Sequence, residues 1–299
     1  MSEQFADNTI YFEEAPSSAS RFKSFCRVLL SRGVVKFGLI VVILLIIIAV
    51  FAPFIAPYDP NAPDISNLRS KPSAEHWLGT DAVGRDTLSR IIYGSRTSLL
   101  VSIVALVASS VIGMSLGLIA GFFGGMTFTV IMRLMDTLMS IPMILLALTI
   151  AAILGGGLTN VMIALGTALV PIYARLMCGQ VLSIKENDYV MAGKSMGAGN
   201  LRLMLRHVFP NCIPPLIVMM TMQLGTTILA EAGLSFLGVG VRPPTPSWGN
   251  MVSDGYTYLQ STPILSLAPG LAIMLVVFAF NMLGDGLRDA LDPRLRGML

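Results

Sequence analysis

Five long runs without Asp, Glu, Lys or Arg alternate with polar segments along the 299-residue chain. They extend over residues 37–58, 97–132, 137–174, 207–230 and 255–284. A helix needs roughly 20 residues, at about 1.5 Å each, to cross a hydrocarbon core about 30 Å thick. The pattern therefore predicts helices that span a membrane rather than the core of a soluble domain.

The second and third runs, of 36 and 38 residues, are too long for single spans, because each would measure roughly 55 Å as a straight helix. Glycines interrupt both runs, at Gly121, Gly124 and Gly125 and again at residues 155–157. We therefore expect an all-α polytopic membrane protein with about six spans. These helices are expected over 34–55, 97–120, 128–153, 158–176, 212–235 and 264–283.

The distribution of basic residues predicts the orientation of these spans. If the N-terminus lies inside, 14 of the 20 Lys and Arg residues fall in inner segments and 6 in outer segments. Both termini are then expected in the cytoplasm. We expect a cytoplasmic segment over 1–33 and a transmembrane domain over 34–299. Within that domain lie an outer loop at about 56–96, an inner loop at about 177–211 and an outer segment at about 236–262.

The composition argues against catalysis and against a bound cofactor or metal. Charged residues make up only 12% of the chain, half of the roughly 25% typical of soluble domains, and the net charge of +3 does not indicate a nucleic-acid partner. The three cysteines and two histidines are scattered, without the spacing of a metal site. Gly193-Lys194-Ser195 resembles the end of a phosphate-binding loop, but Asp188 occupies the position of its first glycine. We therefore expect a non-enzymatic chain with no cofactor of its own.

Within the predicted spans, a few positions have two interpretations each. Gly113, Gly117 and Gly121 recur every four residues, which indicates either plain tight helix packing or a surface on which helices slide. Glu231, near the outer end of the fifth span, is either a hydrated helix end or part of a pathway or gate, and in both cases it should face water or a partner. Arg133 and Asp136, three residues apart, are expected to neutralise each other at a membrane edge.

The inner loop carries the most specific pattern. Residues 191–195 predict a short helix, 197–199 a turn, and the next residues an amphipathic second helix, with Arg202 and Arg206 on its polar side. The apolar positions of this second helix are Leu201, Met204, Leu205 and Val208. Pro210, Pro214 and Pro215 are expected to end it. Such an apolar face with a basic rim either docks a cytosolic partner or lies on the membrane surface.

This loop resembles the EAA loop of ABC importer permeases. Met191-Ala192-Gly193 stands at E-A-A, Gly197 at the glycine, and His207, Phe209 and Pro210 at Ile, Leu and Pro. Met191 replaces the acidic residue and Gly193 the second alanine. Further motifs, at 77–90, 234–249 and 283–294, resemble the dipeptide/oligopeptide/nickel permease branch, so that the likeness covers about residues 34–297.

The resemblance implies a type I (MetI-like) permease that forms half of a translocation pathway for di- or oligopeptides in a bacterial inner membrane. It implies partners: a second homologous permease, two ATP-binding subunits that hold ATP and Mg, an extracytoplasmic solute-binding protein, and membrane lipid. It assigns ATPase coupling to Met191, Ala192, Gly193, Gly197, Leu201, Leu205, Arg206, His207 and Pro210.

Two other functions remain open at this point. One is a nickel or metal-chelate importer of the same family. The other is an ion-coupled secondary transporter, although the inverted repeats and broken helices of that class are not obvious here.

Overall fold

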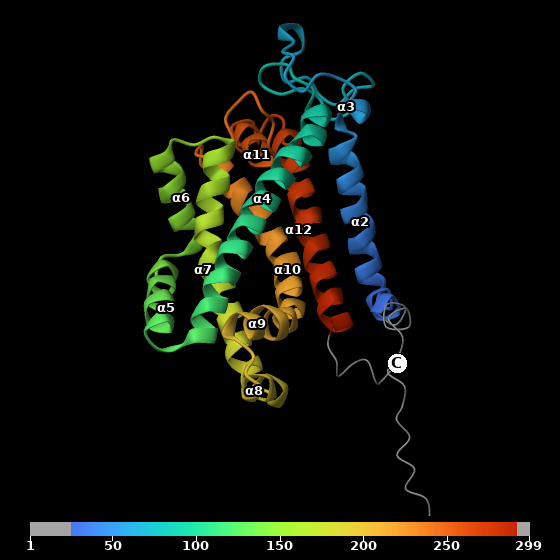
Figure 1. Ribbon diagram of the computed structural model, residues 1–299. Coiled ribbons are helices and arrows are strands. Elements are labelled where there is room, and N and C mark those ends of the chain that lie inside the picture. Colours follow the sequence, from blue (N-terminus) through green and yellow to red (C-terminus); the bar gives the residue numbers. More distant parts are fainter. Residues whose placement is uncertain (1–24, 292–299) are drawn as a thin grey trace, which may run out of the picture.

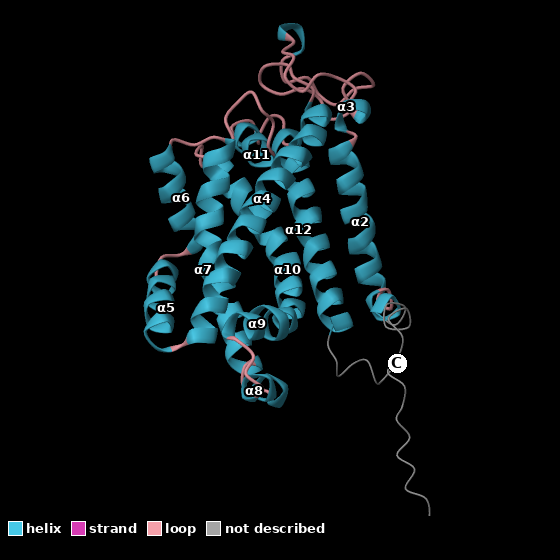
Figure 2. Ribbon diagram, viewed as in Figure 1, coloured by secondary structure: helices cyan, strands magenta, loops and turns pink. Residues whose placement is uncertain are grey.

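The computed structural model describes residues 25–291, and this part of the chain is helical apart from loops and one isolated bridge between Thr80 and Asp86. The α-helices are α2 (Gly33–Val50), α3 (Ala52–Ile55), α4 (Thr87–Phe123), α5 (Gly125–Met139), α6 (Met143–Leu154), α7 (Leu158–Ile184), α8 (Asp188–Ser195), α9 (Asn200–Leu203), α10 (Phe209–Phe236), α11 (Trp248–Tyr256) and α12 (Ile264–Leu291). A 3₁₀ turn, η1 (Ile65–Asn67), a π-helical turn, η2 (Met204–Val208), and helical residues at 25–29 are also present. Figure 2 shows the all-α class that the sequence predicts.

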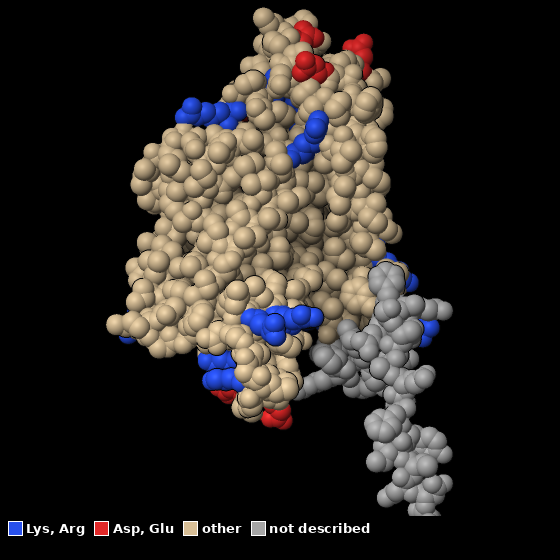
Figure 3. Space-filling model, viewed as in Figure 1, with Lys and Arg blue, Asp and Glu red and all other residues tan. Residues whose placement is uncertain are grey.

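Five of these helical stretches are long and apolar enough to span a bilayer: α2, α4, α7, the continuous stretch from α9 to α10, and α12. The pair α5 and α6, bent by 87° at the break between them, brings the number to six if the pair counts as one broken span. On the face shown in Figure 3, charged side chains gather at the two ends of the molecule, and an uncharged band lies between them. This is the surface expected of a protein whose middle contacts lipid.

The two long apolar runs break where glycines were expected to break them. Gly124, with φ 67° and ψ −155°, ends α4 and precedes α5. Residues 155–157 all have positive φ values, of 87°, 65° and 102°, and they turn the chain from α6 into α7. Because side chains with a Cβ rarely adopt this backbone region, glycine allows both turns.

Several helices differ from the expected bounds, since α7 continues to Ile184 and α12 to Leu291. α4 is not confined to 97–120 but begins at Thr87, where the Asp86 carboxylate accepts a hydrogen bond from the Ser89 amide. The third span is not one helix over 128–153 but the bent pair α5 and α6. Pro142 lacks a backbone N–H and disfavours helix at the residue before it, which explains the break between them.

The prolines after the inner loop do not end a helix, contrary to the expectation. Helical structure continues from Asn200 to Phe236 through Pro210, Pro214 and Pro215. The π-helical turn η2 ends at Val208, two residues before Pro210. Local π adjustments of this kind let membrane helices accommodate proline, because they change which carbonyl groups need a donor.

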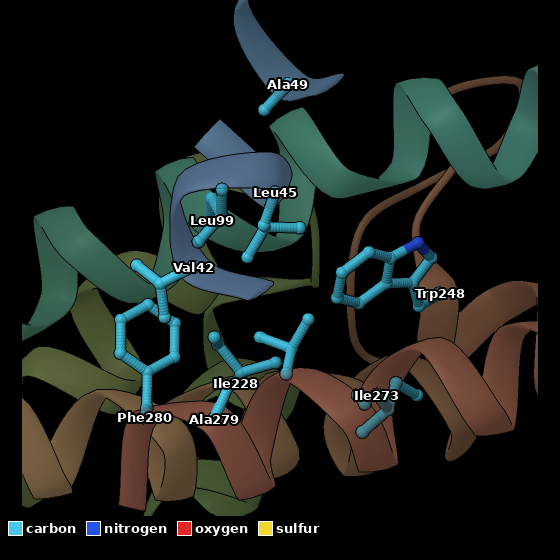
Figure 4. Close-up of a cluster of buried hydrophobic side chains, with 11 residues drawn as sticks. Val42, Leu45, Ala49, Leu99, Ile228, Trp248, Ile273, Ala279 and Phe280 are labelled. Carbon is cyan, nitrogen blue, oxygen red and sulfur yellow. The ribbon is translucent and has the colours of Figure 1, made fainter. Parts of the chain in front are cut away.

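The helices form one bundle, in which α4 packs along α7, while α10 packs against α12 and α2 lies on the other side of α12 (Figure 1). A cluster of buried side chains joins α2, α4, α10, α11 and α12, and Figure 4 shows Leu45 and Ile228 between Phe280 on one side and Trp248 on the other. Trp248 is almost fully buried, and its Nε1 donates to the carbonyl oxygen of Ile91, 3.0 Å away. The short helix α11 is therefore anchored to the start of α4.

The two ends of the bundle carry different structures. The connection between α3 and α4 and the helix α11 lie at one end, and α8 and α9 lie at the other, where α2 begins and α12 ends (Figure 1). The predicted segment 1–33 lies mostly outside the described residues. The same is true of 292–299, which includes the end of the last motif of the resemblance.

Candidate coupling site

The turn between α8 and α9 is built on Gly197. This residue has a φ of 83° and directly follows the C-cap residue of α8, Met196. The Gly197 amide donates to the Lys194 carbonyl oxygen at 3.0 Å, and the Ala198 amide donates to the Gly193 carbonyl oxygen at 3.1 Å. These two bonds form a Schellman motif, which closes a helix with a left-handed residue. The glycine of the EAA pattern therefore has the backbone conformation expected of it.

Gly193 lies on the buried side of α8. A Cβ atom built there would lie 2.9 Å from Cδ2 of Leu203, so that a larger residue would require the end of this side chain to shift. A small residue at the last position of E-A-A therefore lets Leu203 pack against α8.

The outer face of this turn is apolar and open. Met191 is 50% exposed, Leu201 65% and Leu205 51%. Ala192 and Arg206 are also exposed. The apolar face expected from the sequence is thus divided, because Met204 and Val208 turn inward and are buried while Leu201 and Leu205 remain outside. We call the exposed residues Met191, Ala192, Leu201, Leu205 and Arg206 the coupling face.

The coupling face is firmly attached to three spans. Beneath it, buried side chains of α4, α7, α8, η2 and α10 form one cluster, which includes Leu118, Met177, Val190 and Val208. Tyr189 in α8 also accepts a hydrogen bond from the Asn211 side chain in α10 at 3.2 Å. A displacement of α8 therefore moves the adjoining ends of α7 and α10 with it.

Lys185 ties the same region to α4. Its Nζ donates to the carbonyl oxygen of Gly121 in the last turn of α4, at 3.0 Å. A cation at a helix C-terminus is favoured by the helix dipole. The sequence shows only a lysine after a span, and nothing in the pattern indicates that it reaches a helix 64 positions earlier.

His207 and Pro210 lie in the continuous helix and not on a separate loop. His207 is half-buried within η2, and its carbonyl oxygen accepts from the Asn211 side chain at 2.6 Å. Pro210 is exposed in the first turn of α10. These two residues of the motif lie beside the coupling face, where the π-helical turn joins it to the span.

The glycine stripe on α4 lies directly against α7. A Cβ atom at Gly113 would lie 2.5 Å from the Val170 carbonyl oxygen, and one at Gly117 would lie 2.2 Å from the Ala174 carbonyl oxygen. A Cβ atom at Gly121 would lie 2.9 Å from the Val181 side chain. The two backbones therefore approach as closely as in other small-residue helix interfaces. This geometry is that of tight packing, and sliding along the stripe remains a prediction.

Glu231 is not a hydrated helix end. Its side chain is 0% exposed, and its Oε1 accepts from the Ser235 hydroxyl at 2.8 Å. The expectation that it faces water was wrong, because α10 is covered there by α4 and α11. Sequence periodicity could not reveal this burial, since α10 has apolar residues around most of its circumference. A pathway or gate role for Glu231 stays a prediction.

Comparison with known proteins agrees with this geometry. A family model described as the inner membrane component of binding-protein-dependent transport systems matches residues 113–297. A second model, described as the N-terminal transmembrane domain of oligopeptide transport permease C, matches residues 20–72. The chain thus belongs to the family of binding-protein-dependent transport inner membrane components. It is a multi-pass inner membrane protein, and it is the permease of an ABC importer.

Individual relatives are similar over nearly their whole length. The chain is 46% identical over 259 residues to the dipeptide transport system permease protein DppC of Alkalihalophilus pseudofirmus, covering 87% of this chain and 85% of the relative. It is 46% identical over 265 residues to the di/tripeptide transport system permease protein DppC of Pseudomonas aeruginosa, covering 87% and 88%. It is 44% identical over 257 residues to the glutathione transport system permease protein GsiD of Escherichia coli, covering 86% and 85%.

The fold has a solved counterpart. A chain from inward-facing conformations of the MetNI methionine ABC transporter superposes with a TM-score of 0.56 at 20% identity, covering 67% of this chain and 96% of that chain. The type I importer permease fold is thereby confirmed, and the ion-coupled secondary transporter is set aside. A permease of this family works with an ATPase and a binding protein.

Proposed function

We propose that this chain forms one half of the translocation pathway of an importer for di- or oligopeptides, and that the coupling face docks on a cytoplasmic ATPase. The observation that supports this proposal best is the pairing of an exposed apolar face with a rigid base. Leu201 and Leu205 are open on one side, while Val190, Met204 and Val208 bind the same turn to the bundle on the other. An exposed apolar patch rimmed by charge is typical of a protein interface.

The mechanism follows from this attachment. ATP and Mg are bound by two ATP-binding subunits, which close on each other and displace the α8–α9 turn. Because the turn is joined to α4, α7 and α10, it transmits a rigid-body motion to the spans and does not bend on its own. The spans then alternate between inward-open and outward-open arrangements.

The partners have defined places in this proposal. A second, homologous permease completes the pathway. An extracytoplasmic solute-binding protein docks on the outer loop 56–96 and the segment 236–262, which lie at the end of the bundle opposite α8 (Figure 1). The termini face the cytoplasm, which agrees with the excess of Lys and Arg on that side. The chain itself holds no nucleotide.

The substrate class rests on the relatives. Those reported above are named for dipeptides, di- or tripeptides and glutathione, which is itself a tripeptide. This favours short peptides over nickel or a metal chelate. Selection among peptides would still depend chiefly on the binding protein.

The test is reconstitution of the complete importer in proteoliposomes. We expect uptake of a labelled di- or tripeptide that requires ATP, the binding protein and both permeases, and that is unaffected by collapsing ion gradients. Mass spectrometry of the ligand released from the purified binding protein should give a short peptide. Uptake driven by an ion gradient without ATP would contradict the transport mechanism, and a released metal chelate would contradict the substrate class.

A further inference from the structure

A charged groove lies between α5 and α7, away from the coupling face. Its volume is about 570 Å³, within the range of about 300–1,000 Å³ found for small-molecule sites. Phe128, Met132 and Leu182 contribute apolar walls. The ionic groups in the lining are Arg133, Asp136 and Arg175.

The charges in this groove are arranged differently from the expectation. Asp136 does not pair with Arg133 on its own helix but with Arg175 across the groove, where the guanidinium donates to the carboxylate. Each of these two side chains is about half exposed. Within the described range 25–291, Arg133 is exposed and has no ion-pair partner. The groove therefore holds two guanidinium groups and one carboxylate.

The position of the groove makes these charges informative. α7 ends at Ile184, nine residues after Arg175, so that the guanidinium group originates roughly 14 Å inside the inner end of that helix. Half-exposed charges within a membrane-spanning bundle are strongly disfavoured against lipid and almost always face a cavity or another protein group. The groove must therefore open toward water or protein, as the wall of a transport pathway does.

We propose that this groove is a binding site on the transport pathway for the free carboxylate of a peptide, held by Arg133 and Arg175. This inference rests on the proposed function and names a contact that the permease itself makes with the substrate. Guanidinium groups bind carboxylates through two parallel hydrogen bonds. Asp136 positions Arg175 and adds a negative charge that attracts the ammonium end of the same peptide. The apolar walls accept different side chains without selecting among them.

The test uses a cysteine reporter in the assembled importer in nanodiscs, where both sides are accessible. Gly179 lines the groove, and a Cβ atom there has nothing within 4 Å, so that Gly179→Cys introduces a thiol without a clash. Its modification rate is measured with an anionic and a cationic methanethiosulfonate reagent. Thr257→Cys, at the exposed end of α11, is the matched reporter outside the groove. The unmodified chain, which has half-buried Cys26, buried Cys212 and buried Cys178 in the groove lining, gives the background rate.

We expect the anionic reagent to modify the groove reporter faster than the cationic reagent. Adding Arg133→Gln should lower this preference severalfold and leave the Thr257 reporter unchanged. Millimolar dialanine should slow modification of the groove reporter, whereas dialanine amide, which lacks the carboxylate, should not. The protection by dialanine should be lost in Arg133→Gln.

Three results would overturn the inference. In the first, neither reagent modifies the groove reporter. In the second, dialanine and its amide protect the reporter equally. In the third, protection follows the content of phosphatidylglycerol in the nanodisc, which would make the groove a lipid site. ATP-driven peptide uptake by the wild-type importer is measured separately. If uptake is normal and protection fails, the groove proposal is wrong and the proposed function stands.

Discussion

Gly197 allows the coupling mechanism to be tested with a single matched pair of substitutions. Gly197 has a φ of 83°, whereas Gly199, two residues later, has a φ of −67° and a ψ of 152°. A Cβ atom at either position has nothing within 4 Å. Replacement by serine therefore introduces no clash at either site, and only the replacement at Gly197 introduces backbone strain.

The size of the effect follows from this difference. A residue with a Cβ costs about 1–2 kcal/mol in the left-handed region. One to two kcal/mol corresponds to roughly a 5- to 30-fold change in an equilibrium. In Gly197→Ser the Schellman turn should therefore open in a much larger fraction of molecules, and α8 should lose its fixed position. Gly199→Ser places a favourable N-cap residue before α9 and should leave the turn intact.

The assay compares peptide uptake with ATP hydrolysis by the importer in proteoliposomes. We expect Gly197→Ser to lower uptake per ATP hydrolysed by roughly 5- to 30-fold, if coupling follows the fraction of closed turns. Gly199→Ser should behave as wild type, and size-exclusion chromatography checks that both complexes assemble. Normal uptake by Gly197→Ser would refute the reasoning, as would an equal loss in both variants.

Three further substitutions test other contacts. Gly117→Ala forces a methyl group to within 2.2 Å of the Ala174 carbonyl oxygen and should cost about 1–3 kcal/mol, seen as a lower melting temperature in detergent. Gly166→Ala on the same interface meets its nearest atom at 3.6 Å and should melt as wild type. Lys185→Met removes the charged hydrogen bond to α4, a contribution of about 1.5–3 kcal/mol, and should reduce uptake per ATP hydrolysed. Lys185→Arg keeps a charged donor at this position and should retain normal uptake per ATP. Glu231→Gln keeps an oxygen acceptor for the neighbouring serine hydroxyl and should leave thermal stability unchanged.

Each of these expectations has a result that contradicts it. Equal melting temperatures for Gly117→Ala and wild type would show that α4 and α7 separate without cost. Normal coupling in Lys185→Met would mean that α4 moves independently of the inner loop. A large loss of stability in Glu231→Gln would show that the buried carboxyl makes contacts that an amide cannot replace. If that variant is stable but inactive in uptake, the pathway role predicted for Glu231 gains support.

The sequence alone determined the features that depend on local chemistry. Lengths of uncharged chain determine how many helices cross lipid, because each charge in hydrocarbon is costly. Glycines at 124 and 155–157 mark the turns, and Gly197 marks the coupling turn, because only a residue without a Cβ adopts these backbone angles easily. These properties need no knowledge of which helices are neighbours.

The tertiary structure decided everything that depends on those neighbours. Asp136 lies only three residues after Arg133, yet it pairs with Arg175, 39 positions later, because α7 brings that guanidinium group across the groove. Glu231 is buried because α4 and α11 cover that side of α10. Pro210 does not end its helix, since the preceding π-helical turn changes the hydrogen-bond pattern. Hydropathy and spacing describe one helix at a time, whereas ion pairing and burial are properties of the space between helices.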